Sequence, residues 1–290
     1  MPCPARAGTV AALPIRRYHA ALEDLYARYN RREYVHPDPL EFLYVYDDLR
    51  DREIVGLVAA ALALGRVASI LRSVRRALDR LGPHPAALLE GVSAGGLRRM
   101  FADFKHRFIT GEDVAALLWG ARGVARRHGS LRACFAAAMG PRDETVVPAL
   151  GAFVDELVAA GGRRSRALAH PCRGSACKRL NLYLRWMVRS DAVDPGGWRG
   201  MPASRLVIPL DTHMHCIGLA LGLTARRQAN LAAALDMTAA FREIVPADPV
   251  RYDFALTRLG IRSDTDMDEF LARCGAGSRH GAPGVPPPGE

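Results

Sequence analysis

The chain has 290 residues, about half of them apolar, and carries 40 basic against 30 acidic side chains, a formal net charge of +10. It can bury one large core or two smaller ones, and no apolar run reaches the roughly 18 residues that a bilayer span needs, which excludes a membrane protein. The surplus of cations points first to a polyanion such as nucleic acid, although genomic base bias also produces arginine-rich chains.

The beginning of the chain and its cysteines indicate the compartment. The first residues, MPCPARAGTVAALP, hold proline and glycine where a signal peptide has an unbroken apolar stretch, so we expect a cytoplasmic protein. The cysteines are scattered, without CxxC spacing, so we expect free thiols, no disulfide framework, no iron–sulfur cluster and no cofactor. They are Cys3, Cys134, Cys172, Cys177, Cys216 and Cys274.

Apolar residues recur with helical spacing along most of the first half of the chain. Residues 15–35 are predicted to form a helix, followed by a proline-broken turn and a short apolar stretch over residues 42–46. The pattern over residues 51–81 predicts two helices that meet at Gly65, because one helix of that length without caps is unusual in a globular protein. Further helices are expected at 84–90, 94–107, 111–128, 130–139 and 144–160.

The second half of the chain has the same helical character, with more turns. HPCRGSACK leads into a helix that places Leu180, Leu184 and Met187 on one face, and residues 190–205 resemble a loop. A short extended piece precedes Asp211, which should cap a helix ending near Gly222. We expect Thr224 to cap the next helix, through about Val245, and Pro249 to open the last one. Because alternating strand patterns are nearly absent, the predicted class is all-α.

The predicted organisation is two helical domains that flank a cleft. One domain, carrying Asp211, comprises residues 14–50 with 191–273, and the other comprises residues 51–190 and ends in the GSACK hairpin. Residues 1–13 and the Pro/Gly-rich residues 274–290 are predicted to be disordered.

Lysine is rare in this chain. Lys105 and Lys178 are the only lysines among 40 basic residues. Arginine can replace lysine for charge and phosphate contact, but its pKa above about 12 prevents it from offering an unprotonated amine. If Ser175 caps the following helix, Lys178 lies in the first turn, where the helix dipole favours the neutral amine that attack on a sugar carbon needs. A solvated lysine on a capped helix is the structural alternative.

Asp211, preceded by the extended piece Val207–Leu210, has two interpretations. A helix N-cap is the default, because its carboxylate accepts hydrogen bonds from backbone amides. An ionised carboxylate in a cleft can also orient an amine and stabilise positive charge that develops at C1′ of deoxyribose.

Together, Gly174–Ser175–Ala176–Cys177–Lys178 and Ile208–Pro209–Leu210–Asp211–Thr212–His213 resemble the helix-hairpin-helix DNA glycosylase superfamily, in its endonuclease III and 8-oxoguanine glycosylase types. In that superfamily a small-residue hairpin ending in lysine precedes an aspartate that heads a helix. The resemblance covers about residues 50 to 262. The run from GSACK to FALTRLG also looks like a bacterial family known only as a domain of unknown function, which supplies no activity.

The resemblance implies a DNA repair enzyme, a DNA glycosylase with AP-lyase activity. Lys178 would displace a damaged base and form a Schiff base with the sugar, and Asp211 would assist. Ala176 stands where the superfamily has its second hairpin glycine, and HPCR is an atypical start to the hairpin. The gap between Lys178 and Asp211 is longer than in endonuclease III and is similar to that of archaeal 8-oxoguanine glycosylases. Oxidised guanine is therefore the expected lesion. Damaged double-stranded DNA is the expected partner of a monomeric protein, which the resemblance places at the bacterial nucleoid.

Two sets of residues complete the expected site. DNA contacts are expected from basic and hairpin residues, although Lys105 could equally belong to a solvated helix face: Arg66, Lys105, Arg173, Gly174, Ser175, Ala176 and Arg179. An extruded base requires a pocket and a stacking surface, for which the candidates are Tyr183, Trp186, Trp198 and His213. Core packing is the alternative for each aromatic ring.

Two other functions compete with this one. Asp211, His213 and His215 could be metal ligands of a hydrolase, but residues two apart on a helix point to different faces, so no metal site is expected. A helix-hairpin-helix protein could instead bind nucleic acid without cutting it. Such a binder has no need of lysine over arginine at position 178.

Overall fold

The computed structural model describes residues 15–259 and 267–274. Within these ranges the chain is mostly helical, with one hairpin of two short strands, so the predicted all-α class is confirmed. None of the described helices is long and apolar enough to cross a bilayer. The chain ends predicted to be disordered lie almost wholly outside the described ranges.

Described residues 15–161 contain eight α-helices, three short 3-10 helices and the two strands. They are η1 (Ile15–Tyr18), α1 (His19–Tyr29), η2 (Arg32–Tyr34), η3 (Pro39–Val45), α2 (Leu49–Ala61), α3 (Val67–Leu81), α4 (Pro85–Gly91), α5 (Ala94–Met100), β1 (Lys105–His106), β2 (Ile109–Thr110), α6 (Gly111–His128), α7 (Leu131–Ala138) and α8 (Val147–Gly161).

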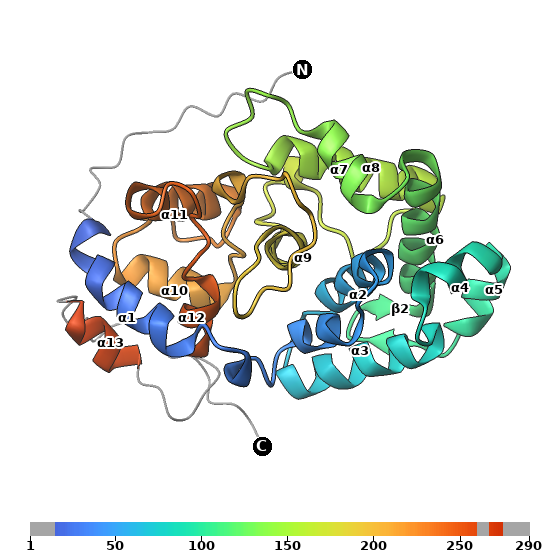
Figure 1. Ribbon diagram of the computed structural model, residues 1–290, viewed down its shortest axis with the longest axis horizontal. Helices are drawn as coiled ribbons and strands as arrows, with labels where there is room; N and C mark the ends of the chain where they lie inside the picture. Colours follow the sequence, from blue (N-terminus) through green and yellow to red (C-terminus); the bar gives the residue numbers. More distant parts are fainter. Residues whose placement is uncertain (1–14, 260–266, 275–290) are drawn as a thin grey trace.

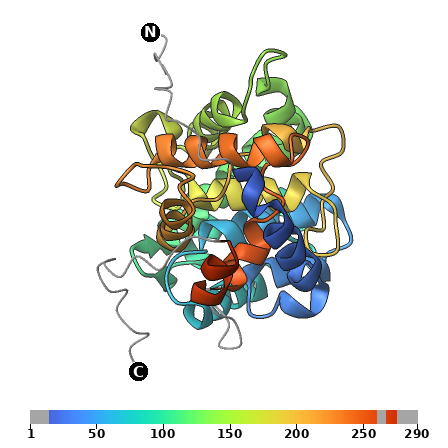
Figure 2. The same cartoon turned by 90° about the vertical axis from the view of Figure 1, so that its left-hand side faces the viewer.

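The elements described after α8 are η4 (Pro171–Arg173), α9 (Lys178–Val188), η5 (Ala203–Arg205), α10 (Thr212–Ala220), α11 (Leu231–Ile244), α12 (Asp253–Arg258) and α13 (Met267–Arg273). Figure 1 shows α2 to α8 gathered on one side, α1 and α10 to α13 on the other, and α9 between the two groups. Helix α1 packs against α12, and η1 packs against α11 (Figure 2). The N-terminal segment therefore lies with the C-terminal helices.

Local signals predicted some helix boundaries and missed others. The break near Gly65 is confirmed: α2 ends and α3 begins on either side of it, and Gly65 has φ of 103°. The helix expected over 94–107 is wrong, because α5 ends at Met100 and Lys105 lies on a strand paired with β2. Thr224 does not cap the helix that follows. The cap is Asn230, which accepts a hydrogen bond from the amide of Ala233, whereas the Thr224 hydroxyl donates to Asp236.

Two further boundaries differ from the prediction. The first helix is shorter than residues 15–35, since α1 ends at Tyr29 and a separate 3-10 turn follows. Pro249 does not open the last helix, because α12 begins only at Asp253 and α13 follows it. In both places the backbone forms tight turns that a single apolar period does not distinguish from helix.

Helix α9 is surrounded by the rest of the core. Its residues Tyr183, Leu184, Trp186 and Met187 are fully buried and belong to one continuous cluster of apolar side chains. Helix α2 packs directly on α9: a Cβ built at Gly56 would lie 3.2 Å from Cε2 of Tyr183. This close approach fixes the ring of Tyr183 between the two helices.

The far end of α9 is held by buried ion pairs. Arg185 pairs with Asp194, at 3.2 Å from Nε to Oδ1, and with Asp253 at the start of α12. One turn later Arg189 pairs with Asp194 and, at 2.9 Å, with Asp248. Both guanidinium groups are almost completely buried. The network joins α9 to the loop that follows it and to the C-terminal helices, and so fixes the direction of α9.

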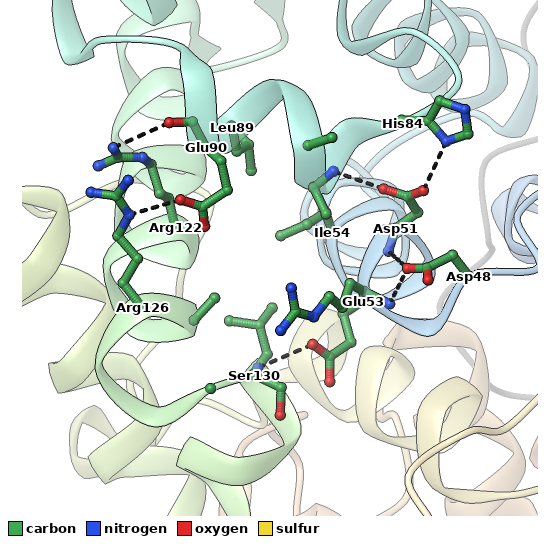
Figure 3. Close-up of a pocket in the computed structure, with 16 residues that line it drawn as sticks. Asp48, Asp51, Glu53, Ile54, His84, Leu89, Glu90, Arg122, Arg126 and Ser130 are labelled. Carbon is green, nitrogen blue, oxygen red and sulfur yellow. Dashed lines mark hydrogen bonds and ion pairs between the residues drawn. The ribbon is translucent and has the colours of Figure 1, made fainter.

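Three carboxylates near the start of α2 cap the N-termini of three helices (Figure 3). Asp48 accepts from the amides of Arg50 and Asp51 at the start of α2 itself. Asp51 accepts from the amide of Ala86 in α4, at 2.8 Å. Glu53 accepts from the amides of Leu131 and Arg132 in α7 and from Nε1 of Trp198, all within 2.9–3.1 Å. One helix therefore supplies capping acceptors to two others.

Replacing Glu53 by alanine should lower the free energy of unfolding by about 3 kcal/mol or more. A lost helix cap costs about 1 kcal/mol, and each buried donor left without an acceptor costs about 1–3 kcal/mol. Urea denaturation would measure the change. The matched control is Glu90→Ala, which removes an exposed carboxylate paired with Arg126 and should stay within about 0.5 kcal/mol. Equal effects of the two substitutions would contradict the capping role.

Candidate active site at the start of α9

The GSACK hairpin forms a tight turn ahead of α9. Gly174 adopts the left-handed conformation with φ of 74°, and Cys177, the residue before the helix, has φ of 48°. Ser175 is not the helix N-cap that the sequence suggested: its hydroxyl accepts from the amide of Cys177, at 3.1 Å, and so closes the hairpin. The helix itself begins without a side-chain cap, with Lys178 as its first residue. The amides of its first turn therefore keep a positive potential that no side-chain acceptor offsets.

Asp211 occupies the position predicted for it. It is the N-cap of α10, and its Oδ1 accepts from the amide of Met214 at 2.8 Å. The strand-like piece before it is buried, and the amide of Ile208 donates to the hydroxyl of Thr238 in α11. This anchoring presents the second carboxylate oxygen of Asp211 away from its own helix.

Lys178 and Asp211 meet across the two helix starts. Nζ of Lys178 lies 2.9 Å from Oδ2 of Asp211, and each side chain is about one third exposed, at 33% and 32%. Burial opposes ionisation of Asp211, but the Lys178 ammonium and the Met214 amide outweigh it, so the pKa of this carboxyl lies below its ordinary value. The pair is thus a reachable amine beside a carboxylate that stays ionised at neutral pH.

The pair lies in a cavity of about 640 Å³. Its lining comes from five places: the turn between α2 and α3, Ala169 ahead of η4, the hairpin with the first turn of α9, the start of α10, and residues 229–230 before α11. The loop before α11 is tied to the hairpin, because the amide of Leu231 donates to the carbonyl of Gly174, at 2.9 Å. Asn230, which sequence reasoning missed, is one of the lining residues. Its position directly before the apolar run LAAALDM is the N-cap signal that could have identified it.

Most of the residues expected to contact DNA fall into two groups, and Arg179 is described after them. Arg173, Gly174, Ser175 and Ala176 line the cavity, although the side chain of Ala176 is buried. Arg66 and Lys105 are exposed outside the lining.

Arg179 lines the cavity and also contacts the protein itself. Its guanidinium donates to the carbonyls of Ala61, at 2.7 Å, and Arg166, at 3.1 Å. These two bonds brace α9 against α2.

The aromatic residues expected in a base pocket require a correction. Tyr183, Trp186 and Trp198 are core residues with at most 1% of their surface exposed. Trp198 packs edge to face on Tyr183, and its Nε1 donates to Glu53. None of the three rings borders the cavity of Lys178. The sequence pattern could not reveal this, because the same residue types serve cores and stacking surfaces alike.

The two histidines that follow Asp211 lie in different surroundings. His213 borders the cavity, and its Nε2 is buried without a hydrogen-bond partner among the described residues. His215 is buried, and its Nε2 lies 2.8 Å from the carbonyl of Arg226. Residues 15–259 and 267–274 contain no cluster of three or more His, Cys, Asp or Glu side chains that could hold a metal ion.

A larger cavity, of about 870 Å³, shares no lining residue with the site of Lys178. It lies between α2, α4, α6 and the start of α7 (Figure 3). Its carboxylates Asp51 and Glu53 are already engaged as helix caps, and Glu90 is paired with Arg126. The acidic groups of this cavity thus have structural roles, and the amine and carboxylate suited to covalent chemistry lie in the smaller one.

Comparison with known protein families gives a match over most of the chain. The model of a family described as "Protein of unknown function (DUF2400)" matches residues 38–262, which include both Lys178 and Asp211. No curated protein and no solved structure matches the chain.

Proposed function

The chain belongs to the DUF2400 family, whose description names no activity, and we propose that its cavity at the start of α9 performs Schiff-base chemistry on a damaged nucleotide in DNA. The proposed class is that of the helix-hairpin-helix DNA glycosylases with AP-lyase activity. The observation that carries the proposal is the 2.9 Å contact between Nζ of Lys178 and Oδ2 of Asp211 inside a cavity.

The chemistry follows from these two groups. Lys178, after giving a proton to the Asp211 carboxylate, has a lone pair that can form a bond to C1′ of the sugar. The bond from C1′ to the departing group breaks, and that group leaves with the bonding electrons and with the proton that Asp211 accepted from Lys178. The Asp211 carboxylate, ionised again by this transfer, stabilises the positive charge on the joined amine and sugar. Lys178 thereby becomes covalently joined to the sugar.

Other features support DNA as the partner. The chain carries a net charge of +10, and the uncapped start of α9 offers amides to a phosphate oxygen close to Lys178. Arg173, exposed on the hairpin, adds a guanidinium next to the cavity. Phosphate contacts of this kind position a duplex without reading its sequence.

Borohydride trapping tests the proposal directly. Purified protein is incubated with duplexes that carry 8-oxoguanine, an oxidised pyrimidine, uracil or an abasic site, with and without borohydride. We expect a covalent protein–DNA adduct that depends on borohydride, with the modified residue mapped by mass spectrometry to Lys178. Absence of an adduct at Lys178 on every duplex would overturn the proposed function.

Asp211→Asn separates the capping role of this residue from its chemical role. Asparagine is as good an N-cap as aspartate, so α10 should keep its start and the melting temperature should change little. The amide cannot accept the proton of Lys178 or stabilise a cation, so the trapping rate should fall by about 100-fold. Single-turnover trapping measures the rate, and thermal unfolding checks the fold. An unchanged rate would show that Asp211 serves only as a helix cap.

A further inference from the structure

We infer that the β1–β2 hairpin is a second contact with DNA, and that the ring of Phe108 at its tip inserts into the base stack beside the nucleotide presented to Lys178. The preferred partner is then a duplex whose stacking is already weakened at one position. The inference rests on the DNA partner of the proposed function, but not on its Schiff base. Its evidence is the exposure of Phe108, the charges around it and the contacts that hold the hairpin at the rim of the cavity.

Phe108 is an exposed aromatic residue. It is 49% exposed, and among residues 15–259 and 267–274 the other large apolar side chains of comparable exposure are Val45 and Leu219. Those two are aliphatic and lie on η3 and α10, far from β1 and β2 in sequence. Because every base has a flat face, an exposed ring can stack on a base whatever the sequence.

The backbone holds Phe108 at the tip of the hairpin. Strands β1 and β2 pair directly, which leaves Arg107 and Phe108 as the two residues of the turn. Arg107 has φ of 53°, a conformation that two-residue hairpin turns ordinarily assign to glycine or asparagine. Both residues of this turn are exposed, although neither is a usual turn residue.

The base of the hairpin is fixed. His106 is buried, with its Nδ1 at 2.9 Å from Oγ of Ser73 in α3 and its Nε2 at 3.0 Å from the carbonyl of Leu64. At the other strand, Thr110 and Asp113 form a reciprocal cap at the start of α6. A ring on a rigid support loses little freedom on binding, so more of its stacking free energy contributes to affinity.

Contacts on two sides join the tip to the wall of the cavity at the start of α9. Arg107 lies against Gly65, a lining residue, since a Cβ built on that glycine would be 2.9 Å from Nη1 of Arg107. On the other side Arg166 donates to the carbonyl of Phe108, at 3.4 Å. Arg179, also a lining residue, donates in turn to the carbonyl of Arg166. The tip of the hairpin therefore lies at the rim of the cavity.

The surroundings of Phe108 are cationic. The acidic residues nearest to it in sequence with exposed side chains, Asp103 and Glu112, are paired with arginines. Three exposed cations lie on the hairpin or contact it: Lys105, Arg107 and Arg166. A protein partner would be expected to meet a contiguous apolar patch. A single ring among cations suits the bases and phosphates of nucleic acid instead.

Insertion of this ring gives the protein a preference among duplexes. Separating two stacked bases costs free energy, and the cost is smallest where a base is missing, mismatched or damaged. The hairpin therefore selects a weakened position in the stack before any chemistry takes place. Phe108 is in this sense a positioning residue, because it acts on the nucleotide that Lys178 then meets.

Binding to a matched pair of duplexes tests the inference. One duplex is fully paired, and the other carries a tetrahydrofuran analogue at one position, which leaves a gap in the stack and has no aldehyde for Lys178 to attack. The full-length native protein should bind the gapped duplex about 10-fold more tightly than the paired one. Phe108→Ala should bring the two dissociation constants together, a change of about 1.4 kcal/mol. Phe108→Tyr keeps the ring and should restore the preference.

Three controls accompany this measurement. Val45→Ala, at an exposed side chain on η3, is the matched control and should keep the full preference. Thermal unfolding checks the fold of each variant, and Phe108→Asn, whose side chain suits a tight turn, repeats the loss of the ring. The dependence of the dissociation constant on salt should be the same in Phe108→Ala as in the native protein, because no phosphate contact is removed.

The outcomes separate this inference from the proposed function. Equal affinity of the native protein for the two duplexes, or a preference that survives in Phe108→Ala and Phe108→Asn, would overturn the inference and leave the Schiff-base function intact. A weaker salt dependence in Phe108→Ala would contradict stacking as the cause. A preference that depends on Phe108, together with no Lys178 adduct on any duplex, would overturn the Schiff-base function alone. Failure to bind either duplex would overturn both.

Discussion

Replacing Lys178 by arginine should abolish the covalent adduct with damaged DNA and leave the affinity for that DNA nearly unchanged. Arginine keeps the positive charge and can still pair with Asp211, which lies 2.9 Å from Nζ of Lys178. Its pKa above about 12 keeps the guanidinium protonated, so no lone pair is available to attack C1′. Removal of a nucleophile of this kind lowers the trapping rate by about 1,000-fold or more.

Two measurements distinguish chemistry from binding in this variant. Borohydride trapping on the abasic duplex reports the imine, and a binding titration at fixed salt reports the phosphate contacts. The matched control is Lys105→Arg, which changes the only other lysine of the chain, on strand β1 and outside the cavity lining. That variant should retain the adduct at Lys178. If Lys178→Arg binds DNA normally and the native protein forms no adduct, the chain is a binding protein without this activity.

Replacing Arg185 by methionine should lower the free energy of unfolding by about 3–5 kcal/mol, because it leaves buried carboxylates without their partner. Arg185 pairs with both Asp194 and Asp253, and all three side chains are nearly inaccessible. Burial alone would lower the pKa of Arg185, but the two carboxylates raise it, so the guanidinium is charged throughout the accessible pH range. Methionine fills much of the same space without a charge.

The loss should depend on pH in a definite direction. Burial raises the pKa of Asp253 to about 6 even beside Arg185, and removal of the guanidinium raises it further. A carboxyl with a raised pKa binds its proton more tightly in the folded than in the unfolded chain. Stability of the variant therefore rises as the pH falls below the folded-state pKa toward the ordinary value of about 4, and the deficit is largest at neutral pH.

Urea denaturation at pH 7.5 and at about pH 5 measures this dependence, within the range where carboxyls of raised pKa titrate. Arg50→Met, at an exposed arginine, is the control and should change stability by less than about 0.5 kcal/mol at either pH. A deficit of Arg185→Met that is small, or that grows at low pH, would contradict the account of the buried network.

Sequence reasoning was most accurate where short-range chemistry determines the outcome. Asp211 was identified as an N-cap because the preference of aspartate for that position needs no knowledge of the rest of the chain. The break at Gly65 was predictable because one uncapped helix over residues 51–81 would be unusually long for a globular protein. The meeting of Lys178 with Asp211 was expected only through the resemblance to a known superfamily, since the two lie 33 positions apart and no local rule brings two helix starts together.

Features set by distant parts of the chain could not be predicted. The β1–β2 hairpin replaces the end of an expected helix, and there the imidazole of His106 lies 3.0 Å from the carbonyl of Leu64, 42 residues away. The helical pattern of α9 suggested one apolar face with Leu180 and Leu184. Tyr183 and Trp186 are buried as well, because helices on both sides enclose α9 (Figure 1). Periodicity indicates one covered face and does not reveal when neighbours cover the others.

The three carboxylates of Asp48, Asp51 and Glu53 have a consequence for the motions of the protein. Any excursion that lifts α2 off its neighbours withdraws the acceptors from the first amides of α4 and α7 at the same moment. Fraying of these three segments is therefore coupled, and they open as one cooperative unit instead of independently. Because α2 also packs on α9, such an opening loosens the helix that begins with Lys178.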